Sequence, residues 1–358
     1  NSLLINIVTG IVLFLAMYFG SVYVLDHLNQ SPEVVIQAKP FFVLLGFSII
    51  TLMIFSTFKQ FAEGLGFTKQ AMRVSIWGNV INIILGIIFV KGLFGIEPMG
   101  IRGVGYSTLI DRCLMAVVMS AYVLRSRNFR KYLKGFVFMQ IDKVRSIKIL
   151  KIGIPVALQG TFEVGAFGAA NVLIGTISPI QQAAHQVAIN MAAVTFMVAG
   201  GISAAAAIRS GNNFGAKEHV NLRFSAISSY HIVLAFMTFT AVLFVVANNW
   251  LPWIITTDTR VIAVASQLLI LAAIFQLFDG AQVVGLGILR GMGDVNVPTL
   301  ITLIAYWVIG LPVSYFIGIY MGYGAQGVWV GLVCGLAAAA IMLYFRFNKI
   351  SKRLILNN

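Results

Sequence analysis

The amino-acid sequence predicts an all-α protein that crosses a membrane many times, and composition, apolar runs and charge placement support this fold class. Hydrophobic residues make up 59% of the 358 residues and charged residues only 10%, with a mean hydropathy of +0.93. Soluble domains contain about 25% charged residues, so a soluble globular protein is excluded. The net charge of +14 comes from Lys and Arg residues spread between apolar blocks. A nucleic-acid-binding module would instead concentrate them on one surface.

Ten segments are long and apolar enough to be helices that cross a bilayer, whose hydrocarbon core takes about 20 helical residues. In chain order they are 3–25, 40–58, 74–95, 103–124, 148–175, 182–208, 225–247, 261–289, 297–320 and 325–345. Polar turns separate them, such as Leu28-Asn29-Gln30-Ser31-Pro32 and Asn248-Asn249-Trp250. The 34 glycines suit the close packing of membrane helices on small residues.

The Lys and Arg residues predict the orientation. Twenty of the 25 lie in one set of alternate connections, which includes the 125–151 loop and the C-terminal tail, and four lie in the other set. Arg112 is left inside a predicted helix. Because cytoplasmic loops are enriched in Lys and Arg, Asn1, the 125–151 loop and the C-terminus are expected on the cytoplasmic side.

Self-comparison predicts an internal repeat. Residues 61–68 are similar to residues 288–295 at an offset of 227. The glycine pattern at 100–104 recurs at 324–328 at an offset of 224. In each pair, the two similar segments lie at equivalent ends of predicted helices.

The repeat implies an organisation in two lobes. The second copy begins near residue 148 and contains six predicted helices, whereas the first shows four, so two helices are expected to precede Asn1. We therefore expect ten of twelve helices in two pseudo-symmetric six-helix lobes, as in transporters with parallel repeats. The expected parts are an N-terminal lobe at 1–125, a basic cytoplasmic linker at 126–147 and a C-terminal lobe at 148–358.

Three carboxylates lie inside predicted spans, namely Asp111, Glu163 and Asp279. An ionisable group costs about 3 kcal/mol at the centre of a membrane helix, so each is a functional candidate. Gln159 lies one turn before Glu163, and Asp279 lies between two glutamines at helical spacing. A carboxyl buried among amides is expected to hold a proton or Na⁺, for which a cationic substrate can compete.

Each of these residues also has a plainer interpretation. Glu163 and Asp279 could be protonated groups that only pack between helices. Asp111 could be neutralised by its neighbour Arg112, although adjacent helical residues point about 100° apart. A lone histidine such as His185 is most simply a hydrogen-bonded packing residue.

Motifs of other protein classes are incomplete. The segment Gly291–Asp294 matches the GxGD string of intramembrane aspartyl proteases, but the sequence has no Tyr-Asp pair for their second aspartate. Asp294 is therefore expected in a turn. The segment Gly285–Gly287 lacks a dinucleotide-binding context, and there is no Walker-type phosphate loop. Cys113 and Cys334 lie in separate apolar runs, and no His or Cys has partners at metal-ligand spacing. We predict neither an enzyme nor a bound cofactor.

Five motifs lie in the C-terminal half. They are Gly153-x-Pro155-x-x-x-Gln159-x-x-x-Glu163, Ala184-His185-Gln186-Val187-Ala188-Ile189-Asn190, Arg209-Ser210-Gly211-Asn212-Asn213-Phe214-Gly215-Ala216, Asp279-Gly280-Ala281-Gln282 and Leu289-Arg290-Gly291-Met292-Gly293-Asp294. With these motifs the chain resembles the multidrug and toxic compound extrusion (MATE) family, in its NorM-like branch. The resemblance runs from the third family helix to the twelfth.

The resemblance implies a secondary active antiporter in the bacterial cytoplasmic membrane. Such a protein exports organic, often cationic and aromatic, compounds in exchange for Na⁺ or H⁺ by alternating access, and is functional as a monomer. The alternative within the superfamily is a flippase for lipid-linked oligosaccharide or polysaccharide. Flippases tend to line their cavity with several basic residues, whereas this chain has one membrane arginine, Arg112, against three carboxylates. An intramembrane hydrolase or a channel are more distant alternatives.

The resemblance also implies site residues. Cation coupling in the C-terminal lobe would use Glu163 and Asp279, with Asn190 nearby. A second cation site in the N-terminal lobe would use Asn82 and Thr108. Asp111 could compensate there for an aspartate of the family's first helix. Gly86 and Phe275 depart from the branch, which has a second asparagine and can have a tyrosine at these places. Candidates for the substrate cavity are Gln159, Phe162, Phe275, Gln276, Phe278 and Gln282.

Overall fold

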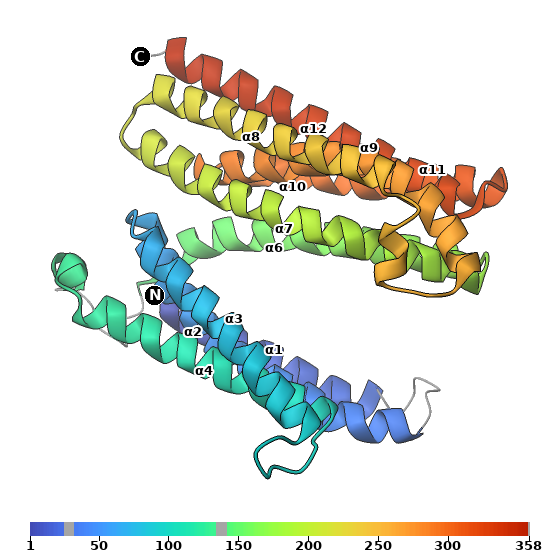
Figure 1. Cartoon of the computed structure of the whole chain (residues 1–358). Helices are drawn as coiled ribbons and strands as arrows, with labels where there is room; N and C mark the ends of the chain where they lie inside the picture. Colours follow the sequence, from blue (N-terminus) through green and yellow to red (C-terminus); the bar gives the residue numbers. More distant parts are fainter. Residues whose placement is uncertain (25–31, 134–141, 357–358) are drawn as a thin grey trace. The chain divides into compact units, whose positions relative to one another are not determined.

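The computed structural model describes residues 1–24, 32–133 and 142–356, and the regular elements in these ranges are helical (Figure 1). The long helices are α1 (Ser2–Phe19), α2 (Pro32–Gly64), α3 (Thr68–Lys91), α4 (Ile101–Arg125), α6 (Lys143–Gly175), α7 (Pro179–Gly215), α8 (His219–Val246), α9 (Thr259–Gly291) and α12 (Gly324–Leu356). Between α9 and α12 the chain forms α10 (Asn296–Leu303), the π-helical η5 (Ile304–Gly310), α11 (Leu311–Tyr315) and the π-helical η6 (Phe316–Tyr320). Short elements are η1 (Gly20–Val24), η3 (Arg127–Phe129), α5 (Arg130–Leu133) and η4 (Leu251–Ile254).

Nine helices of the described residues are long and apolar enough to cross a membrane. The expected count of ten is therefore not confirmed. The range 148–175 does form a helix, α6, but α6 is not among the nine, and its apolar stretch contains Gln159, Glu163 and Asn171. The polar turn expected at 28–31 and residues 134–141 of the expected linker lie outside the described residues. The twelve-helix organisation stays a prediction.

The chain divides into two compact units, Asn1–Ile149 and Leu150–Asn358. In the first unit α2 packs against α1 and α4, and α3 packs against α4. In the second unit α9 is the central helix and packs against α7, α8 and α12 (Figure 1). Most of α9 between Val261 and Leu289 is buried, so its polar residues lie in the interior of this unit.

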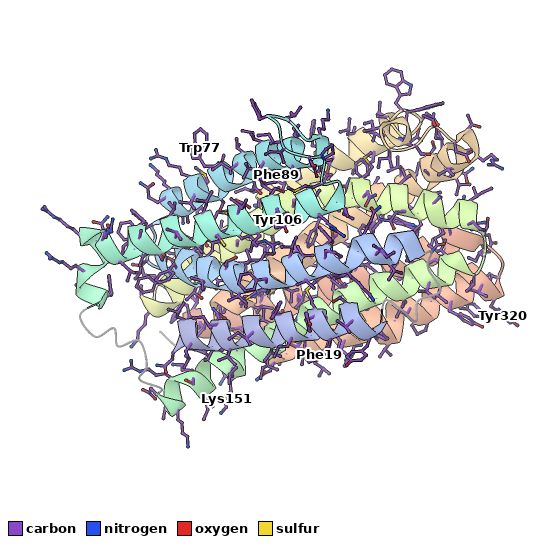
Figure 2. The ribbon with its side chains drawn as sticks, turned by 90° about the horizontal axis from the view of Figure 1, so that it is seen from below. Phe19, Trp77, Phe89, Tyr106, Lys151 and Tyr320 are labelled. Carbon is purple, nitrogen blue, oxygen red and sulfur yellow. The ribbon has the colours of Figure 1, made fainter. Side chains whose placement is uncertain are left out.

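Large apolar side chains cover the outside of the helices. Trp77 of α3 is 66% exposed and Tyr320 at the end of η6 is 77% exposed, and both lie on the outside in Figure 2. Soluble monomers rarely expose large contiguous apolar surfaces. Within a bilayer the same side chains contact lipid, which agrees with the membrane assignment.

Small residues bring α7 and α9 close together. Ser203 Oγ donates a hydrogen bond to the carbonyl oxygen of Val283 over 2.6 Å. A Cβ atom added to Gly287 would lie only 2.5 Å from the Ser203 carbonyl oxygen, and one added to Gly291 would meet the Ala207 carbonyl oxygen. Glycine is thus required on α9 for this approach, as is typical of membrane-helix contacts.

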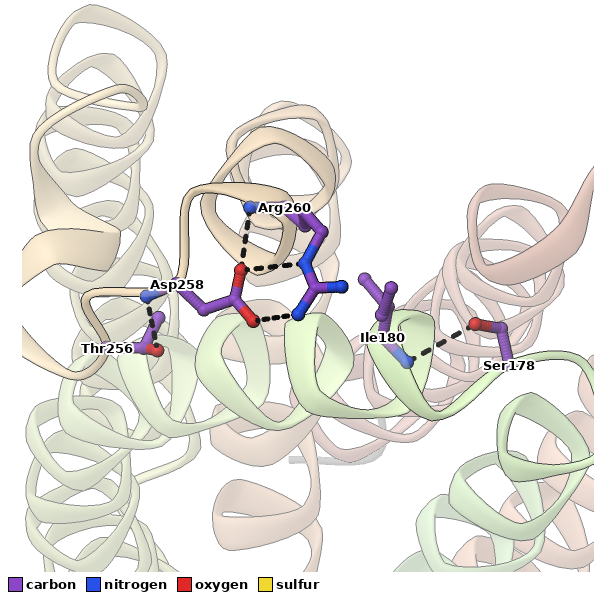
Figure 3. Close-up of polar contacts among 5 residues, drawn as sticks. All are labelled: Ser178, Ile180, Thr256, Asp258 and Arg260. Atoms are coloured by element: carbon purple, nitrogen blue, oxygen red, sulfur yellow. Dashed lines mark hydrogen bonds and ion pairs between the residues drawn. The ribbon is translucent and has the colours of Figure 1, made fainter.

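Side-chain caps fix where α7 and α9 begin (Figure 3). Ser178 Oγ accepts a hydrogen bond from the Ile180 amide over 3.2 Å at the start of α7. At the start of α9 the Asp258 carboxylate accepts one from the Arg260 amide over 2.9 Å. The same carboxylate pairs with the Arg260 guanidinium over 3.0 Å. Hydrogen bonds from Arg260 lower the pKa of Asp258, so this cap stays charged at neutral pH.

The turn between α9 and α10 contains Asp294, as expected from the sequence. Its carboxylate accepts a hydrogen bond from Arg346 Nε of α12 over 2.8 Å. Asp294 therefore joins the C-terminal half of α12 to the turn that follows α9.

Candidate functional site

Two intramembrane carboxylates come together in the second unit. Glu163 of α6 and Asp279 of α9 line the same cavity of about 300 Å³. Asp279 is only 4% exposed and interacts electrostatically with Glu163, which is half-buried. The Oδ1 atom of Asp279 has no hydrogen-bond partner among the described residues. The sequence singled out this pair, and the fold places both members at one cavity.

The other walls of this cavity are apolar. Phe167 of α6, Phe196 of α7 and Phe275 of α9 contribute aromatic rings. The remaining lining residues are Gly160, Val164, Ile189, Ala192 and Ala193. The cavity thus combines two carboxyl groups with aromatic surfaces, a combination that suits a cation with an apolar body.

Of the six substrate-cavity candidates, only Phe275 is among the residues that line this cavity. Gln159 is buried, and its Nε2 donates to the Val295 carbonyl oxygen over 3.1 Å and to Thr299 Oγ1 over 3.0 Å. It therefore joins α6 to α10. Phe162 is half-buried and offers its carbonyl oxygen to η5.

The three remaining candidates lie on α9. Phe278 lines a separate apolar cavity of about 540 Å³ bounded by α8, α9 and α12. Gln276 accepts a hydrogen bond from Thr240 Oγ1 of α8 over 3.1 Å. Gln282 is fully buried, and neither polar atom of its amide has a partner among the described residues. These side chains point to different sides of α9 because one turn covers 3.6 residues.

Asn190 is not among the residues that line the carboxylate cavity. It is exposed on α7, and its Oδ1 accepts a hydrogen bond from Gln186 Nε2 over 3.2 Å. In this turn of α7 the cavity is lined by the neighbouring residue, Ile189, and not by Asn190. The structure therefore brings Glu163 and Asp279 together without Asn190.

Tyr306 is a neighbour of the carboxyl pair that the sequence did not indicate, although it is not among the residues that line the cavity. It lies in η5, is 1% exposed, and its hydroxyl interacts electrostatically with both Glu163 and Asp279. This hydroxyl does not reach the geometry of a formed hydrogen bond. The only sequence signal is a tyrosine at the middle of the 297–320 span, and tyrosine is common in membrane helices.

An aromatic chain connects this site with His185. The ring centroids of Phe167 and Phe275 are 5.9 Å apart, and those of Phe275 and Trp329 are 5.2 Å apart. Trp329 Nε1 in turn donates a hydrogen bond to His185 Nδ1 over 3.1 Å. His185 is buried, and these contacts fit its interpretation as a hydrogen-bonded packing residue.

The first unit brings together the predicted residues Asn82 and Thr108. Asn82 Nδ2 of α3 donates to Thr108 Oγ1 of α4 over 3.4 Å. Asp111, one turn further along α4, is 5% exposed, and its Oδ1 has no partner among the described residues. A Cβ atom added to Gly78 of α3 would lie 2.6 Å from this oxygen.

Arg112 does not form an ion pair with Asp111 in the described part of the chain. Its Nη1 instead donates to Ser48 Oγ of α2 over 2.7 Å. Adjacent helical residues point in different directions, so Arg112 interacts with Asp111 electrostatically without forming an ion pair with it there.

The described residues contain no group of three or more His, Cys, Asp or Glu side chains that could hold a metal ion.

Comparison with known proteins identifies the family. The family model described as MatE matches residues 1–88 and 155–316. A probable multidrug resistance protein NorM of Bacillus licheniformis is 31% identical over 338 residues, which cover 94% of this chain and 75% of that protein. The multidrug resistance protein NorM of Photobacterium profundum is 33% identical over 338 residues, with 93% and 74% covered.

Solved structures share the fold. The crystal structure of the eukaryotic MATE transporter AtDTX14 aligns with a TM-score of 0.85 at 19% identity, over 99% of this chain and 79% of that one. The outward-facing structure of a multidrug resistance MATE family transporter aligns with a TM-score of 0.87 at 18% identity, over 99% and 78%. The chain therefore belongs to the MatE family of multidrug and toxic compound extrusion transporters, and it is a multi-pass integral membrane protein.

Proposed function

We propose that this protein is a secondary active antiporter that exports organic, often cationic and aromatic, compounds in exchange for Na⁺ or H⁺. The observation that supports this most is the pair Glu163 and Asp279 in one cavity inside the membrane-spanning part. Relatives at 31–33% identity are named multidrug resistance proteins. The ion gradient supplies the energy, so no cofactor is needed.

The paired carboxyls provide a reason to bind a cation. A charged carboxylate in a membrane helix costs about 3 kcal/mol or more, and two close carboxylates repel each other. Asp279 has a buried oxygen without a hydrogen-bond partner in the described part of the chain, and leaving such an atom unsatisfied costs about 1–3 kcal/mol. A bound Na⁺ or proton relieves both costs.

The same cavity suits an organic cation. Its volume of about 300 Å³ is enough for a small ligand. Phe167, Phe196 and Phe275 offer ring faces, and a cation over such a face gains about 0.5–2 kcal/mol. Once Na⁺ or H⁺ neutralises the carboxyls, the attraction for a positively charged compound falls.

Coupling follows if the ion and the compound prefer different states of the transporter. In the proposed cycle the compound binds from the cytoplasm when the carboxyls are free. Ion binding from the outside then lowers its affinity, and the compound leaves outward. The protein thus alternates between access to the two sides of the membrane.

A second cation position is proposed in the first unit, at Asn82 and Thr108, with Asp111 one turn away. The contact of Asn82 with Thr108 supports it, as does Asp111 Oδ1, which has no hydrogen-bond partner among the residues that the structure describes. The number of ions exchanged per compound would then depend on both units.

We further propose that the protein lies in the bacterial cytoplasmic membrane with its C-terminus in the cytoplasm. The distribution of twenty of the 25 basic residues supports this orientation. A monomer would suffice, because α6 and α9 of one chain form the carboxylate cavity.

Efflux of ethidium, a fluorescent aromatic cation, from proteoliposomes tests the proposal. The full-length protein is reconstituted, and a Na⁺ or proton gradient is imposed. We expect the double variant Glu163→Gln with Asp279→Asn to lose gradient-driven efflux. The matched control Asp258→Asn removes a carboxylate from the exposed start of α9 and should transport normally. Intact gradient-driven efflux in the double variant would refute the mechanism.

A further inference from the structure

An apolar cavity of about 540 Å³ lies where α8 and α12 pack against each other and against α9 (Figure 1). Of the eleven described residues that line it, eight are aliphatic or phenylalanine, and the others are Tyr230, His231 and Tyr344. Its outer edge faces lipid, because Ile341 and Phe345 of α12 are 51% and 64% exposed. Walls of this kind suit a hydrocarbon chain and disfavour a charged group.

Helical spacing connects this cavity with basic residues at one end of the interface between α8 and α12. Residues four, seven and eleven positions apart lie on one face of a helix. On α8, Arg223 precedes the lining residues Ile227 and Tyr230 by four and seven positions. On α12, Lys352 follows the lining residues Ile341 and Phe345 by eleven and seven positions. Both basic residues therefore lie on the helix faces that line the cavity.

Hydrogen bonds confirm that the two basic residues are neighbours. Arg223 Nη1 donates to Ser351 Oγ over 2.6 Å, and its Nη2 donates to Asn348 Oδ1 over 2.8 Å. Both acceptors are neutral, so these bonds leave the positive charge of Arg223 uncompensated. A guanidinium group has five N–H donors, which is more than these two bonds use. Lys352 directly follows Ser351 and is exposed. Together the two cations suit an anionic group.

The distance between the cavity and these charges matches the depth of one leaflet. Arg223 lies seven residues before Tyr230 and eleven before Leu234, another lining residue. At 1.5 Å per residue these separations are about 10 Å and about 16 Å along α8. One leaflet contributes about 15 Å to the hydrocarbon core. A phospholipid with its phosphate at Arg223 would thus reach the cavity with an acyl chain.

We propose that an anionic phospholipid of the cytoplasmic leaflet binds along the interface of α8 and α12, with its phosphate at Arg223 and Lys352 and an acyl chain in the apolar cavity. The inference goes beyond antiport and uses the proposed orientation only to choose the leaflet. The acyl chain would contact Phe278, the residue before Asp279, so the lipid would pack against the helix that carries this carboxyl. The competing interpretation is a cavity filled by any lipid or by an uncharged compound, neither of which needs the basic residues.

Native mass spectrometry of the full-length protein in detergent distinguishes these interpretations, because it resolves single bound lipids. Phosphatidylglycerol is titrated, and phosphatidylcholine with the same acyl chains is the zwitterionic comparison. In Arg223→Gln with Lys352→Gln we expect the Kd of the first phosphatidylglycerol to rise about 30-fold. This is the effect of losing about 2 kcal/mol, since each basic residue near the membrane surface contributes about 1 kcal/mol. The control Arg209→Gln removes an exposed charge from α7 and should keep the wild-type Kd.

Further variants separate the role of each part of the site. Lys352→Gln alone covers the case in which the double variant does not fold, as judged by its thermal unfolding midpoint, because Arg223 also joins α8 to α12. Its Kd should rise about fivefold. Ala281→Phe fills the cavity and should weaken phosphatidylglycerol binding, whereas Ala235→Phe, at an exposed position of α8 that is not among the lining residues, should not.

Equal wild-type affinity for phosphatidylcholine and phosphatidylglycerol would overturn the inference, as would an unchanged Kd in the folded variants of the basic residues. Wild-type affinity in folded Ala281→Phe would also overturn it. So would displacement of the lipid by an equal concentration of glycerol 3-phosphate, which carries the phosphate without acyl chains. No ion gradient is used in this measurement, so its failure leaves the antiport proposal to the efflux test of Glu163→Gln with Asp279→Asn.

Discussion

Substitution of Gly287 by alanine tests the close contact of α9 with α7. The added Cβ atom would lie 2.5 Å from the Ser203 carbonyl oxygen, about 0.9 Å short of the 3.4 Å at which ordinary contact begins. This neighbour is a backbone atom, so rotation of a side chain does not relieve the overlap. One of the two helices has to move.

The expected cost follows from packing and helix propensity. Overpacking a close contact costs about 1–3 kcal/mol, while alanine gains about 1 kcal/mol over glycine inside a helix. Gly200→Ala on α7 is a matched control, because its Cβ atom would meet nothing within 4 Å. The difference between the two variants isolates the overpacking cost. At about 2–4 °C per kcal/mol for a unit of this size, Gly287→Ala should unfold roughly 2–12 °C below Gly200→Ala.

Thermal unfolding of the purified protein in detergent, followed by tryptophan fluorescence, measures this difference. Equal unfolding midpoints for Gly287→Ala and Gly200→Ala would show that α7 and α9 are further apart than described here. α9, and Asp279 on it, would then not be held in place by a close contact with α7.

Two further predictions concern contacts that fix the second unit. Asp294→Asn should remove the ion pair with Arg346 and lower the unfolding free energy by about 1 kcal/mol; thermal unfolding at low and high salt checks this, and a salt-independent loss would contradict the ionic origin. Trp329→Phe should leave His185 Nδ1 without its donor and cost about 1–3 kcal/mol. Trp253→Phe, at a 52% exposed ring, is its control, and equal midpoints for the two variants would contradict the hydrogen bond.

The helices were predictable because hydropathy and polar turns determine them locally. Each of the ten expected segments overlaps a helical part of the described chain. One of these helices, α6, is not among the nine described helices that are apolar enough to cross a membrane. Its glutamine, glutamate and asparagine side chains lower its hydropathy. Those polar residues also include Glu163, so the feature that weakens the span also marks the site.

The two carboxyls were predictable as candidates because charge is rare in apolar spans. Their meeting in one cavity depends on how α6 and α9 pack, which spacing within each helix does not determine. Gln159 shows the limit clearly. It lies one turn from Glu163, yet its amide bonds Thr299, a residue 140 positions away in the chain.

Tyr306 could not be found from the sequence for a similar reason. It lies in the π-helical η5, which approaches α12 through glycine contacts, and periodicity in the sequence does not predict either feature. The resemblance to the MATE family suggests a tyrosine only at the position of Phe275 on α9. The tyrosine hydroxyl in this structure belongs to Tyr306 of η5 instead.

Ion displacement from the purified protein tests the central claim most directly. Ethidium is added to the full-length protein in detergent, and the release of bound ²²Na⁺ or of protons into weakly buffered solution is recorded. We predict that ethidium displaces the ion from the wild type, and that Glu163→Gln with Asp279→Asn abolishes the displacement. Undiminished ion release by the double variant would contradict the assignment of the coupling site to Glu163 and Asp279.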